Sequence, residues 1–230
     1  MYPQNPETIV IKNKFYPGGL TELDIWNYYQ KVKRDLIKTS FNRDLMFVVM
    51  TDVNKPIIRR KMKSGQAIRL NPKNYDNLIT GRSVSIHSGM GNIEDFGIVD
   101  IDIDPRDGFR WARKATAEVY DFIMNDMPVI STAQIRYTGK TSFHIVCNFG
   151  RKSKIDAIRF LLQKFLAGSD LTRRYSIAGR RGLGVPNLDL SINKIRGNFI
   201  TLHSLSVVGL RCMEVSYNNL MRFDPTKARI

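Results

Sequence analysis

Acidic residues alternate with apolar residues near the middle of the sequence. The segment 96–105 reads FGIVDIDIDP, so a β-strand here places Asp100, Asp102 and Asp104 on one face. Such a row of like charges repels itself unless cations neutralise it, and Mg²⁺ and Mn²⁺ prefer carboxylate oxygens. With Asp189 as a further carboxylate, the pattern predicts a divalent metal site; two ions about 3.5–4 Å apart are the arrangement of phosphoryl transfer. The simpler interpretation is a solvated acidic strand that prevents aggregation.

Lysine and arginine greatly outnumber the acidic residues. The 36 basic and 21 acidic side chains give a net charge of +15 and a pI near 10.0, which is typical of proteins that neutralise phosphate groups. Nucleic acid is therefore the expected partner. A generally basic surface is the alternative, because charge alone carries no specificity.

The remaining composition is that of a globular protein without membrane segments. The chain is 43% hydrophobic and 25% charged, and it contains no apolar run long enough to span a bilayer. Its N-terminus lacks the features of a secretory signal, and its two cysteines, Cys147 and Cys212, are too few for a disulfide framework or a zinc site. We therefore expect a cytoplasmic, reducing environment.

The apolar spacing predicts alternating strands and helices. Thr21 is expected to cap a helix that carries Ile25, Tyr29, Val32 and Leu36 on one side. Further helices are predicted over 109–127 and from Ser153 to near Gly168. Strands are predicted over 45–50, 83–87, 96–104, 134–137 and 142–149, and a last strand region over 198–213. The basic segment 59–63 and the glycine-rich segment 177–184 are expected to be exposed loops that could contact a phosphate backbone. This order of elements predicts an α+β fold.

All three histidines, His87, His144 and His203, lie in strand-like segments beside small polar residues. A histidine on a strand is commonly a hydrogen-bonded core residue. Imidazole, hydroxyl and basic groups that converge in this way also suit a triphosphate pocket. Both interpretations stay open on the spacing alone.

Taken together, these segments resemble the archaeo-eukaryotic primase superfamily, in particular the primase-polymerases associated with end-joining ligases. Asp102-Ile-Asp104-Pro resembles the family's Asp-hydrophobic-Asp-Pro segment, and Thr138-Gly-Lys-Thr-Ser-Phe-His144 resembles its Ser-Gly-basic-x-Gly-hydrophobic-His segment. The segments 188–196, 201–203 and 209–211 are similar to the third carboxylate and to the arginine and Ser-Leu-His segments of primase small subunits. The segment 42–47 is similar to their early Asn-Arg-Glu stretch. The matching segments occur in the family's order over residues 42–211.

Three positions depart from the family's pattern. Thr138 replaces a serine, Ser142 a glycine, and Thr201 the serine before the histidine. Ser142 leaves the geometry of its turn open, because it adds a side chain where the backbone would approach a ligand closely. Asp100-Ile-Asp102 can also be aligned with the metal-binding pair, although Pro105 favours the alignment on Asp102 and Asp104. The zinc-binding cysteines and helical subdomain of many primase small subunits are absent, so the resemblance is to a minimal catalytic core.

The resemblance implies a nucleotidyltransferase that uses two divalent ions, Mg²⁺ or Mn²⁺. Asp102, Asp104 and Asp189 would hold the ions, which would activate an attacking 3′-hydroxyl and neutralise the departing pyrophosphate. The residues that would bind the nucleotide are Thr138, Gly139, Lys140, His144, Arg196, His203 and Arg211. The implied fold is an α+β primase-polymerase core with a mixed β-sheet, a palm similar to an RNA-recognition motif (RRM), and packed helices. It would occupy 1–230 as a single catalytic domain, with a division into lobes near 1–95 and 96–230 left open.

The implied partners are a single-stranded or primed DNA template and ribo- or deoxynucleoside triphosphates. A large primase subunit, a ligase or a helicase is a further partner that the sequence leaves open. A metal-dependent nuclease is one alternative, but a nuclease has no triphosphate for the segments around Lys140 and His203 to bind. A second alternative is a non-catalytic RRM-like nucleic-acid-binding module, but the expected Lys/Arg-Gly-Phe run is not found in the sequence.

Overall fold

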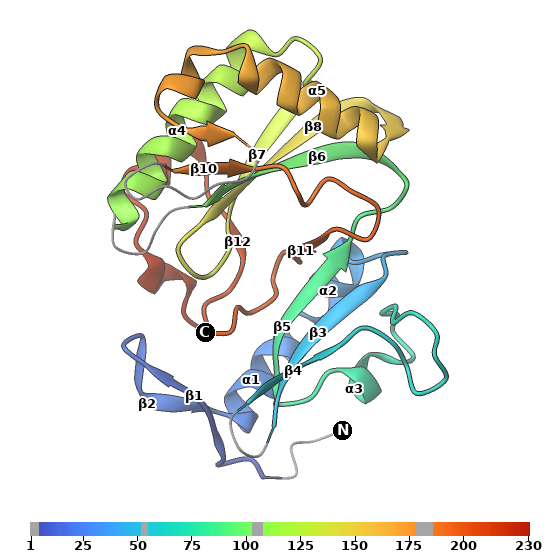
Figure 1. The fold of residues 1–230 in the computed structure, drawn as a ribbon. Coiled ribbons are helices and arrows are strands. Elements are labelled where there is room, and N and C mark those ends of the chain that lie inside the picture. The colour runs from blue at the N-terminus through green and yellow to red at the C-terminus, as the bar shows by residue number, and fades with distance from the viewer. Residues whose placement is uncertain (1–4, 52–54, 103–107, 178–185) are drawn as a thin grey trace. The chain divides into compact units, whose positions relative to one another are not determined.

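The computed structural model describes residues 5–51, 55–102, 108–177 and 186–230, and it confirms the α+β class (Figure 1). The chain forms two compact units. Unit 1 comprises Met1–Gly89, Asn198–Met213 and Asp224–Ile230, and unit 2 comprises Met90–Gly197 and Glu214–Phe223. Asp104, Pro105 and most of the glycine-rich segment 177–184 lie outside the described residues.

Unit 1 contains an antiparallel four-stranded sheet in the order β11-β5-β3-β4 and a separate β1-β2 hairpin. The predicted strands at 45–50 and 83–87 are confirmed as β3 and β5. The elements of unit 1 are β1 (Ile9–Asn13), β2 (Tyr16–Thr21), α1 (Glu22–Lys31), α2 (Lys33–Thr39), β3 (Leu45–Met50), β4 (Pro56–Arg59), α3 (Tyr75–Leu78), β5 (Ser83–Gly89), β11 (Asn198–Ile200) and the 3₁₀ helix η2 (Pro225–Ala228).

Helix α1 begins as its sequence predicts. The Thr21 hydroxyl accepts a hydrogen bond from the Asp24 amide at 3.2 Å, and the Asp24 carboxylate accepts one from the Thr21 amide at 2.9 Å, which completes a capping box. Ile25 and Tyr29 are fully buried on the apolar side. The single predicted helix is divided at Val32, which caps the end of α1 and the start of α2.

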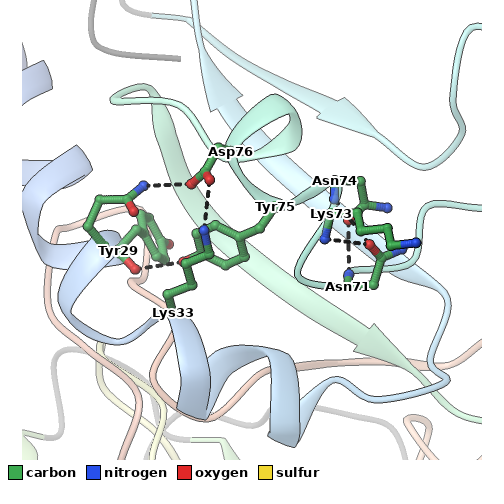
Figure 2. Close-up of polar contacts among 8 residues, drawn as sticks. Tyr29, Lys33, Asn71, Lys73, Asn74, Tyr75 and Asp76 are labelled. Carbon is green, nitrogen blue, oxygen red and sulfur yellow. Dashed lines mark hydrogen bonds and ion pairs between the residues drawn. The ribbon is translucent and has the colours of Figure 1, made fainter.

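Polar contacts join α1 and α2 to the short helix α3 (Figure 2). The buried Tyr75 hydroxyl donates to the Tyr29 carbonyl oxygen at 2.7 Å. The Asp76 carboxylate accepts hydrogen bonds from Lys33 at 2.7 Å and from Gln30 at 3.1 Å. The Lys33 contact, followed by the Gln30 contact, lowers the pKa of Asp76, whereas burial raises the pKa of Tyr29 to about 12.

Unit 2 is built on a six-stranded mixed sheet in the order β12-β7-β8-β6-β10-β9. Strands β7, β8, β6 and β10 pair antiparallel, and β9 runs parallel to β10. The elements of this sheet and unit are β6 (Ile93–Asp102), α4 (Phe109–Asp126), β7 (Thr132–Tyr137), β8 (Phe143–Lys154), α5 (Ile155–Ala167), the 3₁₀ helix η1 (Asp170–Arg173), β9 (Ser176–Ile177), β10 (Asn187–Asp189), β12 (Met213–Glu214) and α6 (Tyr217–Leu220). Helix α5 starts at Ile155 rather than at Ser153, because 153 and 154 continue the pairing of β8 with β6.

Helices α4 and α5 pack on the same face of this sheet (Figure 1). A Cβ atom on Gly97 of β6 would lie 2.7 Å from Ile158 and 2.8 Å from Leu162 of α5, so the absence of a side chain lets this helix approach. Phe109 of α4 contacts the rings of Tyr137 and Phe143. Because side chains alternate along a strand, residues 98, 100 and 102 of β6 lie on the face opposite α4 and α5.

Among the described residues, no helix combines the length and apolar character that crossing a membrane requires.

Candidate active site on the sheet of unit 2

Four ionisable side chains form one row across the sheet of unit 2. Asp189 of β10 pairs with Asp100 of β6, Asp100 pairs with His144 of β8, and His144 pairs with Arg136 of β7. Paired residues in an antiparallel ladder present their side chains on the same face, with Cβ atoms about 4.5–5.5 Å apart. The row lies on the face opposite α4 and α5, and it brings together two predicted site residues, Asp189 and His144.

Asp100 and His144 form the buried centre of this row. Asp100 Oδ1 lies 3.6 Å from His144 Nε2, and the two side chains are 16% and 6% exposed. This separation is longer than a hydrogen bond. Asp100 Oδ1 has no hydrogen-bond partner among the described residues. The row therefore contains a carboxylate oxygen that is shielded from water and that could still accept a hydrogen bond or bind a cation.

Asp102 lies two residues beyond Asp100 on the same face of β6, and it pairs with Asn187 of β10. Asn187 is only 5% exposed, and its Oδ1 has no hydrogen-bond partner in the described part of the chain. The last two residues of this face of β6 therefore stand beside two polar side chains from β10, Asn187 and Asp189.

Asp189 also closes a local turn. Its Oδ1 accepts a hydrogen bond from the Ser191 amide at 2.6 Å, and its Oδ2 accepts one from the Ser191 hydroxyl at 2.9 Å. Farther along, the buried Asn193 side chain hydrogen-bonds both the amide and the carbonyl of Ile98, at 2.7 and 2.6 Å. Asn193 thus continues the attachment to β6 where β10 has ended, and this holds the turn that carries Asp189.

The described donors fit a hard divalent cation in chemical type. Asp100, Asp102, Asp189 and Asn187 supply oxygen atoms on one face, which is the donor set that Mg²⁺ and Mn²⁺ take. No three His, Cys, Asp or Glu side chains of the described residues lie close enough together to hold a metal ion. Asp104, which belongs to the predicted set, lies outside these residues, so its role stays a prediction.

The segment 138–142 forms a closed turn between β7 and β8. The Thr138 hydroxyl donates to the Ser142 carbonyl oxygen at 2.9 Å and lies 2.8 Å from the Ser142 hydroxyl, and the Thr138 amide donates to the same carbonyl at 3.2 Å. Gly139 has φ +83°, a conformation that side chains rarely adopt. Lys140 is exposed, and its carbonyl oxygen accepts a hydrogen bond from the Tyr137 hydroxyl at 2.8 Å. Ser142, the departure from the family's glycine, therefore takes part in closing the turn.

Arg196 lies in the turn region between β10 and β11, beside the start of β6 rather than beside the carboxylates. Its amide donates to the carbonyl oxygen of Met90, just before β6 begins, whereas Asp100 and Asp102 lie where the described part of β6 ends. Arg196 is exposed and has φ +62°. Its proposed contact with a nucleotide remains a prediction.

His203 and Arg211 belong to unit 1. His203 has φ +67°, and its backbone is held by the Tyr28 hydroxyl, which donates to its carbonyl at 2.7 Å, and by the Cys212 carbonyl, which accepts from its amide at 3.0 Å. Arg211 donates to the Lys227 carbonyl oxygen at 3.1 Å, a contact with the C-terminal segment. Arg211 thus has a structural contact that the sequence did not predict.

Backbone conformation singles out the segments that carry the family resemblance. The non-glycine residues with positive φ in the described chain are Asn42, Arg196 and His203. All three lie in those segments. A residue held in this uncommon region requires support from its surroundings, and such residues are frequent at functional sites.

Sequence reasoning did not single out Asn187 or Arg136, and it left Asp100 as an alternative. A strand over 187–189 was not predicted from the sequence. Such a strand would have placed Asn187 on the same face as Asp189 and made it a candidate site residue, because residues i and i+2 share a face. Arg136 shares a face with its neighbour Gln134, whose Oε1 accepts a hydrogen bond from Arg136 Nε at 2.7 Å. Only the pairing of β7 with β8 places Arg136 beside His144.

No protein-family model matches this sequence, and no curated protein matches it. Among solved structures, the chain is similar to the polymerase domain of Mycobacterium tuberculosis ligase D, determined in complex with DNA, with a TM-score of 0.76 and 11% sequence identity. The similarity covers 98% of this chain and 89% of that domain. At this identity the likeness concerns the fold, so the chain is similar in fold to a polymerase domain across nearly its whole length.

Proposed function

We propose that this protein is a template-directed nucleotidyltransferase, a primase-polymerase that joins nucleoside triphosphates on a DNA template. The observation that carries the proposal is the row formed by Asp189, Asp100 and His144, with Asp102 beside it, on the face of the unit 2 sheet opposite α4 and α5. The fold similarity to the ligase D polymerase domain and the net charge of +15 support a substrate that is rich in phosphate.

In this proposal, Asp102, Asp104 and Asp189 hold divalent ions, and Asp100 adds an oxygen donor to the same face. The ions, Mg²⁺ or Mn²⁺, would polarise the reacting phosphate and stabilise the departing pyrophosphate. Rigid strands suit this task because they fix the relative positions of the carboxylates. The register places Asp189 directly opposite Asp100 and diagonal to Asp102, which supports Asp100 as a member of the acidic set.

The turn at 138–142 is the proposed site for the triphosphate. Its hydrogen bonds hold the loop closed before a substrate arrives, so little conformational freedom would be lost on binding. Lys140 supplies a positive charge from this turn, and the His144 imidazole lies at the start of β8 beside Asp100. Arg196, His203 and Arg211 remain proposed contacts for the nucleotide.

The test is nucleotide incorporation by the purified protein. A single-stranded DNA template is supplied with Mn²⁺ or Mg²⁺, with and without an annealed primer, and with labelled ribo- or deoxynucleotides in separate reactions. Products without a primer would identify a primase, and products only with a primer would identify a primer-extending polymerase. The Asp102→Ala variant, prepared in parallel, excludes a contaminating polymerase.

The same assay separates the alternatives. Shortening of the template without incorporation would point to a metal-dependent nuclease. Template binding without any chemistry, under all of these conditions, would point to a non-catalytic nucleic-acid-binding module.

A further inference from the structure

Asn187 is a buried polar residue with an unsatisfied acceptor. The residue is 5% exposed, and its Oδ1 has no hydrogen-bond partner among the described residues. A buried acceptor without a partner is costly, so it requires an explanation, and a bound ion or water molecule is one. The group that would donate to Asn187 Oδ1, or bind it, is not among the described residues.

A second buried asparagine in the same unit shows the usual arrangement. Asn193 is fully buried, and its side chain hydrogen-bonds the amide and carbonyl of Ile98 and also the carbonyl of Leu190 at 3.2 Å. Its amide is satisfied by the backbone. Among the described residues, the side chain of Asn187, six residues earlier, makes no comparable hydrogen bonds to the backbone of the sheet.

The surroundings of Asn187 indicate what it would bind. Asn187 pairs with Asp102, and the next pair but one along the same ladder is Asp189 with Asp100. Asp100 Oδ1 is likewise buried and without a hydrogen-bond partner within the described ranges. Three carboxylates and the Asn187 amide oxygen share one face, so the group that fits among them carries a positive charge. All these atoms are oxygens, and such a set favours a hard cation over a soft one.

We propose that Asn187 is a ligand of a divalent cation bound at Asp102, either through Oδ1 directly or through a water molecule on the ion, and that Asp100 completes the oxygen set. The proposal rests on the proposed function for the identity of the cation, Mg²⁺ or Mn²⁺. It extends the acidic set predicted from the sequence by a neutral ligand on β10.

If the proposal is correct, removing the Asn187 amide should weaken Mn²⁺ binding without lowering the stability of the metal-free protein. In the metal-free protein, Asn187→Leu replaces an amide whose oxygen has no hydrogen-bond partner among the described residues with an apolar side chain of similar size, so the melting temperature should stay the same or rise. The same variant should bind Mn²⁺ about tenfold or more weakly, which is the usual size of such effects around a metal. In the matched control, Asn193→Leu, three hydrogen bonds are lost, so the melting temperature should fall clearly.

The experiment measures Mn²⁺ binding to the full chain by the electron paramagnetic resonance signal of the free ion, together with thermal unfolding in EDTA and in Mn²⁺. Wild-type affinity for Mn²⁺ in folded Asn187→Leu would overturn the proposal, as would a fall in its metal-free melting temperature as large as that of Asn193→Leu. Asn187→Asp provides a second test. The added charge should maintain or strengthen Mn²⁺ binding and lower metal-free stability, and weaker Mn²⁺ binding would contradict the proposal.

These results are independent of the nucleotide assay. If the wild-type protein incorporates nucleotides but Asn187→Leu binds Mn²⁺ normally, only the role of Asn187 is wrong. If the wild-type protein binds Mn²⁺ through Asn187 but incorporates no nucleotide, only the proposed function is wrong.

Discussion

Asp189 of β10 lies directly opposite Asp100 of β6 in an antiparallel ladder. Like charges in this arrangement repel each other and destabilise the pairing of the two strands. The next pair along the ladder, Leu188 and Ile101, faces the other side and is fully buried, so apolar packing holds the strands together despite the repulsion. The stability of this edge of the sheet should therefore depend on what neutralises the two carboxylates.

Divalent cations are expected to raise the melting temperature of the wild-type protein above its value in EDTA, because they bind only where the folded sheet gathers the carboxylates. Asp100→Asn removes one of the opposed charges and should reduce this increase without lowering the melting temperature in EDTA. Thermal unfolding followed by circular dichroism at constant ionic strength measures both effects. An equal Mn²⁺-induced increase in the wild type and the variant would remove Asp100 from the cation site.

Asp102→Ala should reduce nucleotide incorporation to the level of a reaction without protein, while folding and DNA binding persist. The change also relieves repulsion within the acidic set. Incorporation, circular dichroism and DNA binding are measured on the same preparation. Asp95→Ala, at an exposed position near the start of the same strand, is the matched control and should retain activity. Polymerisation by Asp102→Ala would contradict the metal assignment.

Thr138→Val should raise the KM for nucleotide about three- to tenfold, since it removes the hydroxyl that closes the turn on Ser142 and a net hydrogen bond contributes about 1 kcal/mol. Thr138→Ser keeps the hydroxyl and should behave like the wild type. Steady-state kinetics at saturating template separates KM from kcat. Equal KM values for the valine and serine variants would show that the hydroxyl does not organise the site.

Asp76→Asn should lower stability at neutral pH but not in acid. The hydrogen bond from Lys33 holds the folded pKa of Asp76 below its ordinary value of 3.8, so the carboxylate stabilises the fold above that pH. This contribution is lost as the pH falls through the lowered folded pKa. The Lys33 and Asp76 side chains are 28% and 49% exposed, so the effect should not exceed about 1 kcal/mol. Urea unfolding of both proteins at neutral pH and in acid measures it, and a pH-independent difference would exclude the ionised carboxylate as its cause.

Local patterns in the sequence predicted most of the elements that position the site. The alternation over 96–104 predicted a strand with Asp100 and Asp102 on one face, and β6 confirms it as far as Asp102. The capping residues of α1 and the apolar spacing of α4 were likewise sufficient, because capping and helical periodicity depend on neighbours within a few residues. Val32 was not predicted as a break, because its apolar side chain fits the helical spacing and no glycine or proline marks the position.

The sequence by itself determined the strands, the helices and the acidic face, because these follow from interactions between residues that are close along the chain. Only the tertiary structure decided which residues oppose one another. It placed Asp189 beside Asp100 and Asn187 beside Asp102, across more than eighty residues of intervening chain. It also assigned Asn198–Met213 to unit 1 and Glu214–Phe223 to unit 2. Such pairings depend on register and on packing between distant segments, and a shift of one residue would turn these side chains to the other face of the sheet.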